Sequence, residues 1–178
     1  IGPISSFQQV EETNYLLKYG GFNTIESLSL TNIQDTEYQL KNSYGSFFND
    51  LKPYHIVGNY FICHSGVKSD YFEIQPEKIN ESAFYFNRYS FLCEKRKYLS
   101  KYTIIFGHTG FMWPYVDKVK IGIDTAACFM EDQPLTSFCI ETKMFFNSNQ
   151  RNYSIKSLPS ICCPIIPLPL EYRSYLPF

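Results

Sequence analysis

Hydrophobic residues recur along this chain first with helical spacing and later in short extended runs. In residues 36–51 they lie three or four positions apart, as on one face of a helix: Leu40, Tyr44, Phe47, Phe48 and Leu51. Residues 7–19 carry a similar pattern, and Gly20-Gly21 follows as a helix stop. Residues 82–99 predict a further helix, with a buried set of Phe84, Phe91, Leu92, Tyr98 and Leu99.

The extended runs predict strands and two hairpins. Residues 54–57 and 60–63 are strand-like runs joined by Gly58-Asn59, a dipeptide typical of a hairpin turn. Residues 103–106 predict a buried strand, and residues 118–123 predict another. The runs 135–141 and 143–146 predict a closing hairpin.

Composition and charge narrow the classes of protein to which this chain can belong. The chain has 178 residues, 44% hydrophobic and 19% charged, which is typical of a globular domain. A net charge of -1 disfavours nucleic acid as the main partner. No apolar run is long enough to span a membrane, so we expect no membrane partner. The six cysteines are irregularly spaced, which favours reduced thiols and a cytoplasmic location.

Three predicted strands end in a polar residue with small neighbours. These ends carry His64, His108 and Asp124, and ligand-binding residues concentrate at such positions. Two such histidines could bind one metal ion through neutral imidazole. Each signal alone is also typical of a structural role, namely a hydrogen-bonded histidine or, for Asp124, a side chain that caps a turn. We interpret His55, inside a strand, as structural.

The order of several motifs resembles the C-terminal half of bacterial-type serine/threonine phosphatases of the phosphoprotein-phosphatase family, within the calcineurin-like metallophosphoesterases. The resemblance covers roughly residues 14–148. Its segments are Tyr15–Gly21, Leu51–Val67 with the equivalent of the His-Ala-Gly motif, Phe86–Leu92 with the Trp-x-Arg equivalent, Ile105–Thr109 with Gly-His-Thr, Lys120–Phe129 with the Ile-Asp-Thr-Gly equivalent, and Leu135–Thr142.

The chain also departs from the family pattern. It lacks the Gly-Asp-x-His-Gly, Gly-Asp-x-x-Asp-Arg-Gly and Gly-Asn-His-Glu motifs, so we expect an incomplete catalytic domain whose N-terminal part is missing. Ser65 replaces Ala, Phe86 replaces Trp, and Ala126 replaces Gly, where a positive φ would strain the backbone. Lys143 stands where the closing turn of the family often has Gly.

The resemblance implies an α/β (α+β) fold, a four-layer sandwich of two mixed β-sheets flanked by helices. Residues 1–148 would form the partial metallophosphoesterase domain. Residues 149–178 would form a Pro-rich C-terminal tail, irregular or extended, because proline blocks regular ladders. Without its N-terminal strands, the domain is expected to expose a sheet edge and to self-associate.

The resemblance also implies a site. The intact family binds two divalent metal ions (Mn, Fe or Zn). Here His64 and His108 would bind one of them, in at most one partial site. Arg88 would bind the phosphate of a phosphoprotein or another phosphoester, and Asp124 would orient a ligand histidine. Because the bridging carboxylates belong to the missing motifs, we expect this chain alone to hydrolyse no phosphoester at a useful rate.

Three functions remain open at this stage. The first is a serine/threonine protein phosphatase present as a fragment or split protein. The second is a diadenosine tetraphosphatase-like hydrolase of the same fold. The third is a degenerate domain that binds but does not catalyse.

Overall fold

The computed structural model describes residues 22–27, 33–68, 71, 81–94 and 101–158. Contacts divide the chain into two compact units, Ile1–Leu51 and Lys52–Phe178, which are treated separately.

The first unit contains two described helices, α2 (Phe22–Ser27) and α3 (Ile33–Asp50). Helix α3 confirms the helix predicted for residues 36–51 and begins three residues earlier. The helix predicted for residues 7–19 lies outside the described residues. No helix in the described part of the chain is long and apolar enough to cross a membrane.

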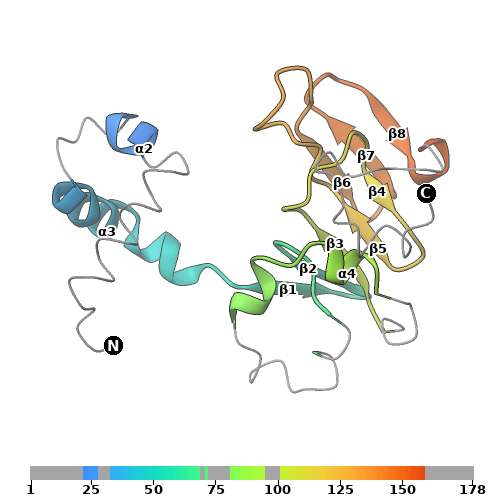
Figure 1. The fold of residues 1–178 in the computed structure, drawn as a ribbon, viewed down its shortest axis with the longest axis horizontal. Coiled ribbons are helices and arrows are strands. Elements are labelled where there is room, and N and C mark those ends of the chain that lie inside the picture. Colours follow the sequence, from blue (N-terminus) through green and yellow to red (C-terminus); the bar gives the residue numbers. More distant parts are fainter. Residues whose placement is uncertain (1–21, 28–32, 69–70, 72–80, 95–100, 159–178) are drawn as a thin grey trace. The chain divides into compact units, whose positions relative to one another are not determined.

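The second unit contains two β-sheets, which Figure 1 shows with few helices around them. The five-stranded sheet has the order β1-β2-β3-β5-β4, and the three-stranded sheet has the order β6-β7-β8. The strands are β1 (Tyr54–Val57), β2 (Tyr60–Cys63), β3 (Thr103–Phe106), β4 (Tyr115–Val116), β5 (Lys120–Gly122), β6 (Thr136–Cys139), β7 (Met144–Asn147) and β8 (Asn152–Ser154). The mixed α/β class with two sheets is therefore confirmed.

Strand alternation sends neighbouring side chains to opposite faces of the larger sheet, which builds two cores. On one face, Ile104 and Phe106 join a cluster with Phe84 and Phe91 from the short helical segments. On the other face, Ile105 and Ile121 pack with Phe145 of β7. The second cluster therefore joins the two sheets face to face.

Both predicted hairpins are confirmed. Strand β1 pairs antiparallel with β2 with Val57 opposite Tyr60, and β6 pairs antiparallel with β7. Strand β4 was not predicted from the sequence. Strand β8 lies within the segment assigned to the tail, so regular structure continues past residue 148, with the 3₁₀ turn η6 (Ile155–Ser157) after it. Residues 159–178 lie outside the described part.

The single helix predicted for residues 82–99 is wrong over its described part. The structure has a 3₁₀ turn, η4 (Glu81–Phe84), and a one-turn helix, α4 (Tyr89–Leu92), with non-helical residues between them. The break coincides with two bonds that Asn87 makes to residues distant in sequence: its N–H donates to the Ser65 hydroxyl, and its side-chain amide donates to the Gly66 carbonyl oxygen. Phe84, Phe91 and Leu92 are buried as predicted; Tyr98 and Leu99 are not among the described residues.

Candidate metal and phosphate site

The site lies at one edge of the larger sheet. Strands β2, β3 and β5 run parallel to one another, so their carboxyl ends meet at the same edge. His64 follows β2 directly, and His108 and Asp124 come two residues after β3 and β5. The topology therefore brings together the three strand ends that the sequence singled out.

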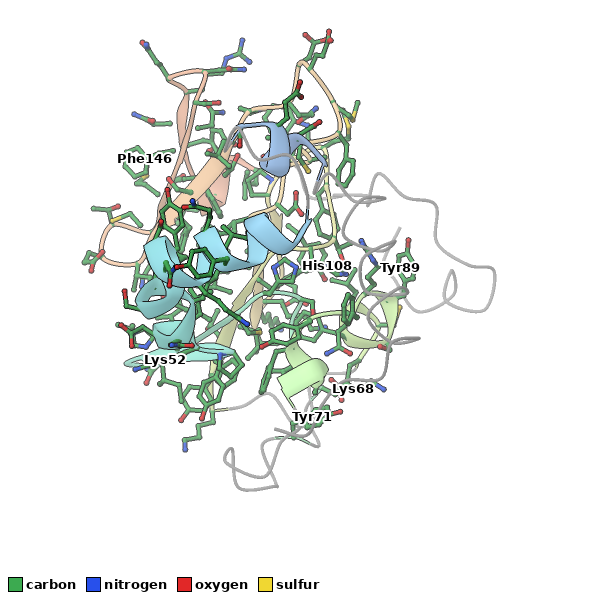
Figure 2. All side chains as sticks on the ribbon, turned by 90° about the vertical axis from the view of Figure 1, so that its left-hand side faces the viewer. Lys52, Lys68, Tyr71, Tyr89, His108 and Phe146 are labelled. Atoms are coloured by element: carbon green, nitrogen blue, oxygen red, sulfur yellow. The ribbon has the colours of Figure 1, made fainter. Side chains whose placement is uncertain are left out.

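The imidazole rings of His64 and His108 face each other. His64 Nε2 lies 3.2 Å from His108 Nδ1, and the ring centroids are 4.9 Å apart. The Gly107 N–H donates to the His64 carbonyl oxygen at 2.7 Å, which ties the two strand ends together. His64 is exposed and His108, labelled in Figure 2, is half-buried. The pair therefore presents two ring nitrogens beside each other at the protein surface.

The surroundings of His108 keep its ring neutral. Burial, the positive charge of Arg88 and the proximity of His64 together lower the pKa of His108 from the ordinary value of 6.5 to about 4. The Asp124 carboxylate acts in the opposite direction. At neutral pH the ring is thus in the form that binds metal ions.

The two histidines suit one part of a metal site. Two nitrogens each about 2.0–2.1 Å from one ion would be about 3.0–3.4 Å apart, close to the observed spacing of 3.2 Å. Among the residues that the structure describes, no three His, Cys, Asp or Glu side chains are grouped to hold an ion. The described donors thus fit a two-ligand partial site.

Arg88 is held against the same loop. It lies directly before helix α4, and its Nη1 donates to the His108 carbonyl oxygen at 2.7 Å. A guanidinium group has five N–H donors in a planar fork. The other Arg88 donors make no hydrogen bond with any residue that the structure describes. Within the described part of the chain, most Arg88 donors therefore have no protein partner.

Ser65 and Asn87 hold the Arg88 segment in place. The Ser65 hydroxyl donates to the Phe84 carbonyl oxygen at 2.6 Å and accepts from the Asn87 N–H at 3.0 Å. The Asn87 side-chain amide donates to the carbonyl oxygens of Gly66 at 3.0 Å and of Ala83. The sequence analysis missed this network, although Asn next to Arg88 is a residue that often bonds local backbone.

Asp124 has a turn-forming contact. Its Oδ1 accepts the N–H of Ala126 at 2.8 Å, as in an Asx turn. Ala126 has a φ of 59°, so the backbone takes the positive φ at which the sequence analysis expected strain. The influence of Asp124 on the pKa of His108 places its charge near the ring, and no hydrogen bond between the two appears among those described. The structure thus favours the structural reading of this aspartate.

Two further residues complete the surroundings. The Thr109 hydroxyl is buried and has no hydrogen-bond partner among the described residues. His55 is the second residue of β1, opposite Ile62, and its side chain is exposed.

Comparisons with family models, with curated proteins and with solved structures found no match for this chain.

Proposed function

We propose that this chain carries part of the site of a metal-dependent phosphoesterase, and that the enzyme is a serine/threonine protein phosphatase acting on phosphoproteins. The observation that carries the proposal is the spacing of 3.2 Å between His64 Nε2 and His108 Nδ1 at neighbouring parallel strand ends. The Arg88 guanidinium bonded to the same loop adds the group that binds an anion. The choice of a protein phosphatase rests on the motif order described above.

Each residue has a stated part in this proposal. His64 and His108 would hold one divalent ion, which supplies an activated water and positive charge for the phosphoryl oxygens when bound. Arg88 would bind two phosphate oxygens, because its planar fork matches their geometry. The bond from Arg88 to the His108 carbonyl fixes the distance between the phosphate-binding group and a metal ligand. Residues of this chain would thereby orient the substrate relative to the ion.

The assignment of the two sheets to a metallophosphoesterase sandwich is part of the same proposal. Two sheets packed face to face, with short helical segments on the outer face of one, are compatible with part of a metallophosphoesterase sandwich. We propose that residues 52–158 supply the second sheet and part of the first.

Metal binding tests the proposal directly. We expect calorimetry to detect Mn²⁺ binding by the full chain, and the double variant His64→Ala, His108→Ala to lose it. His55→Ala is the matched control, because it removes an exposed histidine of the same sheet and is expected to bind as wild type does. Equal binding by the double variant and wild type, or no binding by either, would contradict the proposed site.

Catalysis by the chain alone is a separate prediction. Catalytic metal sites generally use at least three protein ligands, and the described residues group only two. We therefore expect no useful hydrolysis of p-nitrophenyl phosphate by the pure chain with Mn²⁺. Turnover that is lost in Arg88→Ala would show instead that this chain holds a complete site.

A further inference from the structure

A lysine is buried next to the segment that carries Arg88. Lys120 lies in β5, and its side chain is only 2% exposed. Lysine is almost never buried to this extent unless polar groups surround its charge, because an ammonium group that leaves water without partners is costly. The partners of Lys120 therefore show what this charge does in the fold.

The ammonium group binds the C-terminal end of helix α4. Lys120 Nζ donates to the carbonyl oxygen of Leu92 at 2.9 Å and to that of Glu94 at 3.3 Å. It also lies over the Phe91 ring, 5.0 Å from the centroid. The last carbonyl groups of a helix lack partners within the helix, and a lysine can supply them. Because a helix of one turn is unstable alone, this contact helps to hold α4 in place.

The charge is also connected to a well-bonded turn of the larger sheet. The Asp117 carboxylate lies 3.8 Å from Lys120 Nζ as an ion pair. Asp117 Oδ1 accepts the N–H groups of Val119 and Lys120 at 2.7 and 2.8 Å. Its Oδ2 accepts the Tyr115 hydroxyl at 3.1 Å. Lys120 therefore bridges the turn between β4 and β5 and the end of α4.

A short path of bonds connects this bridge to Arg88. Leu92 accepts from Lys120 at its carbonyl oxygen, and its N–H donates to the Arg88 carbonyl oxygen at 3.0 Å. The Arg88 side chain in turn donates to the His108 carbonyl oxygen. The serine and asparagine network described above holds the chain directly before Arg88. Arg88 thus lies between two fixed points, and Lys120 supplies the second.

We propose that Lys120 is a positioning residue for Arg88: its buried ammonium group holds helix α4 so that the Arg88 guanidinium stays beside the histidine pair. Without the ammonium group, the carbonyl oxygens of Leu92 and Glu94 lose a donor, and the turn that follows Arg88 loosens. The consequence for phosphate affinity rests on the proposed function, whereas the consequence for the Arg88 side chain does not.

Nuclear magnetic resonance of the full chain labelled with ¹⁵N tests both consequences. The guanidinium signal of Arg88 is assigned by its loss in Arg88→Lys. Lys120→Met removes the charge and keeps a long apolar side chain. We expect the guanidinium protons of Arg88 to exchange with water about five- to tenfold faster in Lys120→Met than in wild type, because the loss of one hydrogen bond changes an equilibrium by about this factor. Inorganic phosphate, the anion probe, should shift this signal saturably in wild type and bind about five- to tenfold more weakly to the variant.

Phe145→Leu is the matched control. Phe145 is fully buried in the core on the opposite face of the larger sheet, so this variant loses stability through a cluster that includes no residue of α4. We expect its Arg88 exchange and its phosphate affinity to equal those of wild type. If Lys120→Met does not fold, Lys120→Gln replaces it with the same expectation, because its amide can still donate a hydrogen bond but carries no charge.

The outcomes separate this role from the proposed function. Unchanged Arg88 exchange and phosphate affinity in the Lys120 variant would overturn the positioning role and leave the phosphate site intact. Equal effects in Phe145→Leu would also overturn it, because general loss of stability would then explain both. Faster Arg88 exchange in the Lys120 variant, with no phosphate shift in wild type, would support the positioning role and contradict the proposed function.

Discussion

Among the described glycines, Gly66, two residues after His64, has the least room for a side chain. Its φ is 89°, and a Cβ there would lie 2.3 Å from the ring of Phe91, which is fully buried and cannot move away. We therefore expect Gly66→Ala to lower the free energy of unfolding by about 2–5 kcal/mol, through left-handed strain plus overpacking. Urea denaturation measures the loss.

Gly58 provides the matched control. It has a φ of 55°, and nothing lies within 4 Å of its added Cβ. Gly58→Ala should therefore show the backbone strain alone, about 1–2 kcal/mol. Equal losses for the two variants would mean that the contact with Phe91 does not restrict Gly66.

Cys63, directly before His64, makes the stability of the folded chain depend on pH in the alkaline range. Burial raises the pKa of its thiol from 9.0 to about 12 in the folded chain. Between these two values the unfolded chain has lost a proton that the folded chain keeps. The contribution to stability is therefore complete below about pH 9 and is lost as the pH rises toward 12.

Urea denaturation at several alkaline pH values tests this contribution. Cys63→Ala, which has no thiol to ionise, is expected to lose less stability over this range than wild type, although it is less stable at neutral pH. Tyrosines ionise in both proteins and so cancel in the comparison. Parallel pH profiles would contradict the assignment to Cys63.

The sequence could predict a site residue only where the residue's immediate sequence neighbours carried the signal. His64 and His108 stood out because each follows an apolar run and has small neighbours, and Arg88 stood out through motif order. The turn role of Asp124 and the left-handed φ of 64° at His108 depend on the folded loops. Lys143 has a φ of 58°, a left-handed conformation that glycine adopts more readily than lysine.

At the scale of elements, the segment from η4 to α4 depends on one asparagine. Asn87 bonds Ser65, Gly66 and Ala83 and so sets the break that places Arg88 beside His108. Asn87→Ala is expected to lower the free energy of unfolding by about 1–3 kcal/mol, because it leaves half-buried polar groups unpaired. It should also increase hydrogen exchange at the amides of α4.

Asn152→Ala is the control for this prediction, since Asn152 is an exposed residue of β8. Little change is expected in either its stability or the exchange of α4. Unchanged exchange in Asn87→Ala would indicate that packing of Phe91, and not the asparagine, orders this segment.

Elements could be predicted where the signal was local. The Gly58-Asn59 turn determines the first hairpin, and helical spacing determines α3. The same spacing misled at residues 82–99, because apolar residues on one helix face cannot reveal side-chain bonds to distant backbone. Strands β4 and β8 have only two and three residues, which is too short for an alternating pattern to be visible in the sequence. The parallel pairing of β2, β3 and β5 depends on contacts between residues far apart in the sequence.

At the scale of the whole molecule, the outer strand of the larger sheet determines how copies of the chain should interact. Strand β1 ends the described strand order, so one side of its backbone has no neighbouring strand in that sheet. Its Ile56 and Val57 are 39% and 41% exposed. Unpaired strand edges with apolar side chains favour pairing between chains. We therefore expect self-association that increases with protein concentration in sedimentation velocity.

A charge on this strand should reduce that association. Ile56→Lys puts a positive charge on the edge, and lysine on edge strands opposes pairing between sheets. We expect the association constant to fall about tenfold, which corresponds to about 1.4 kcal/mol. Phe129→Lys adds the same charge at a residue that is 80% exposed in a loop, and it should associate as wild type does. If wild type stays monomeric at high concentration, β1 is protected; if both variants weaken association equally, net charge and not the strand edge controls it.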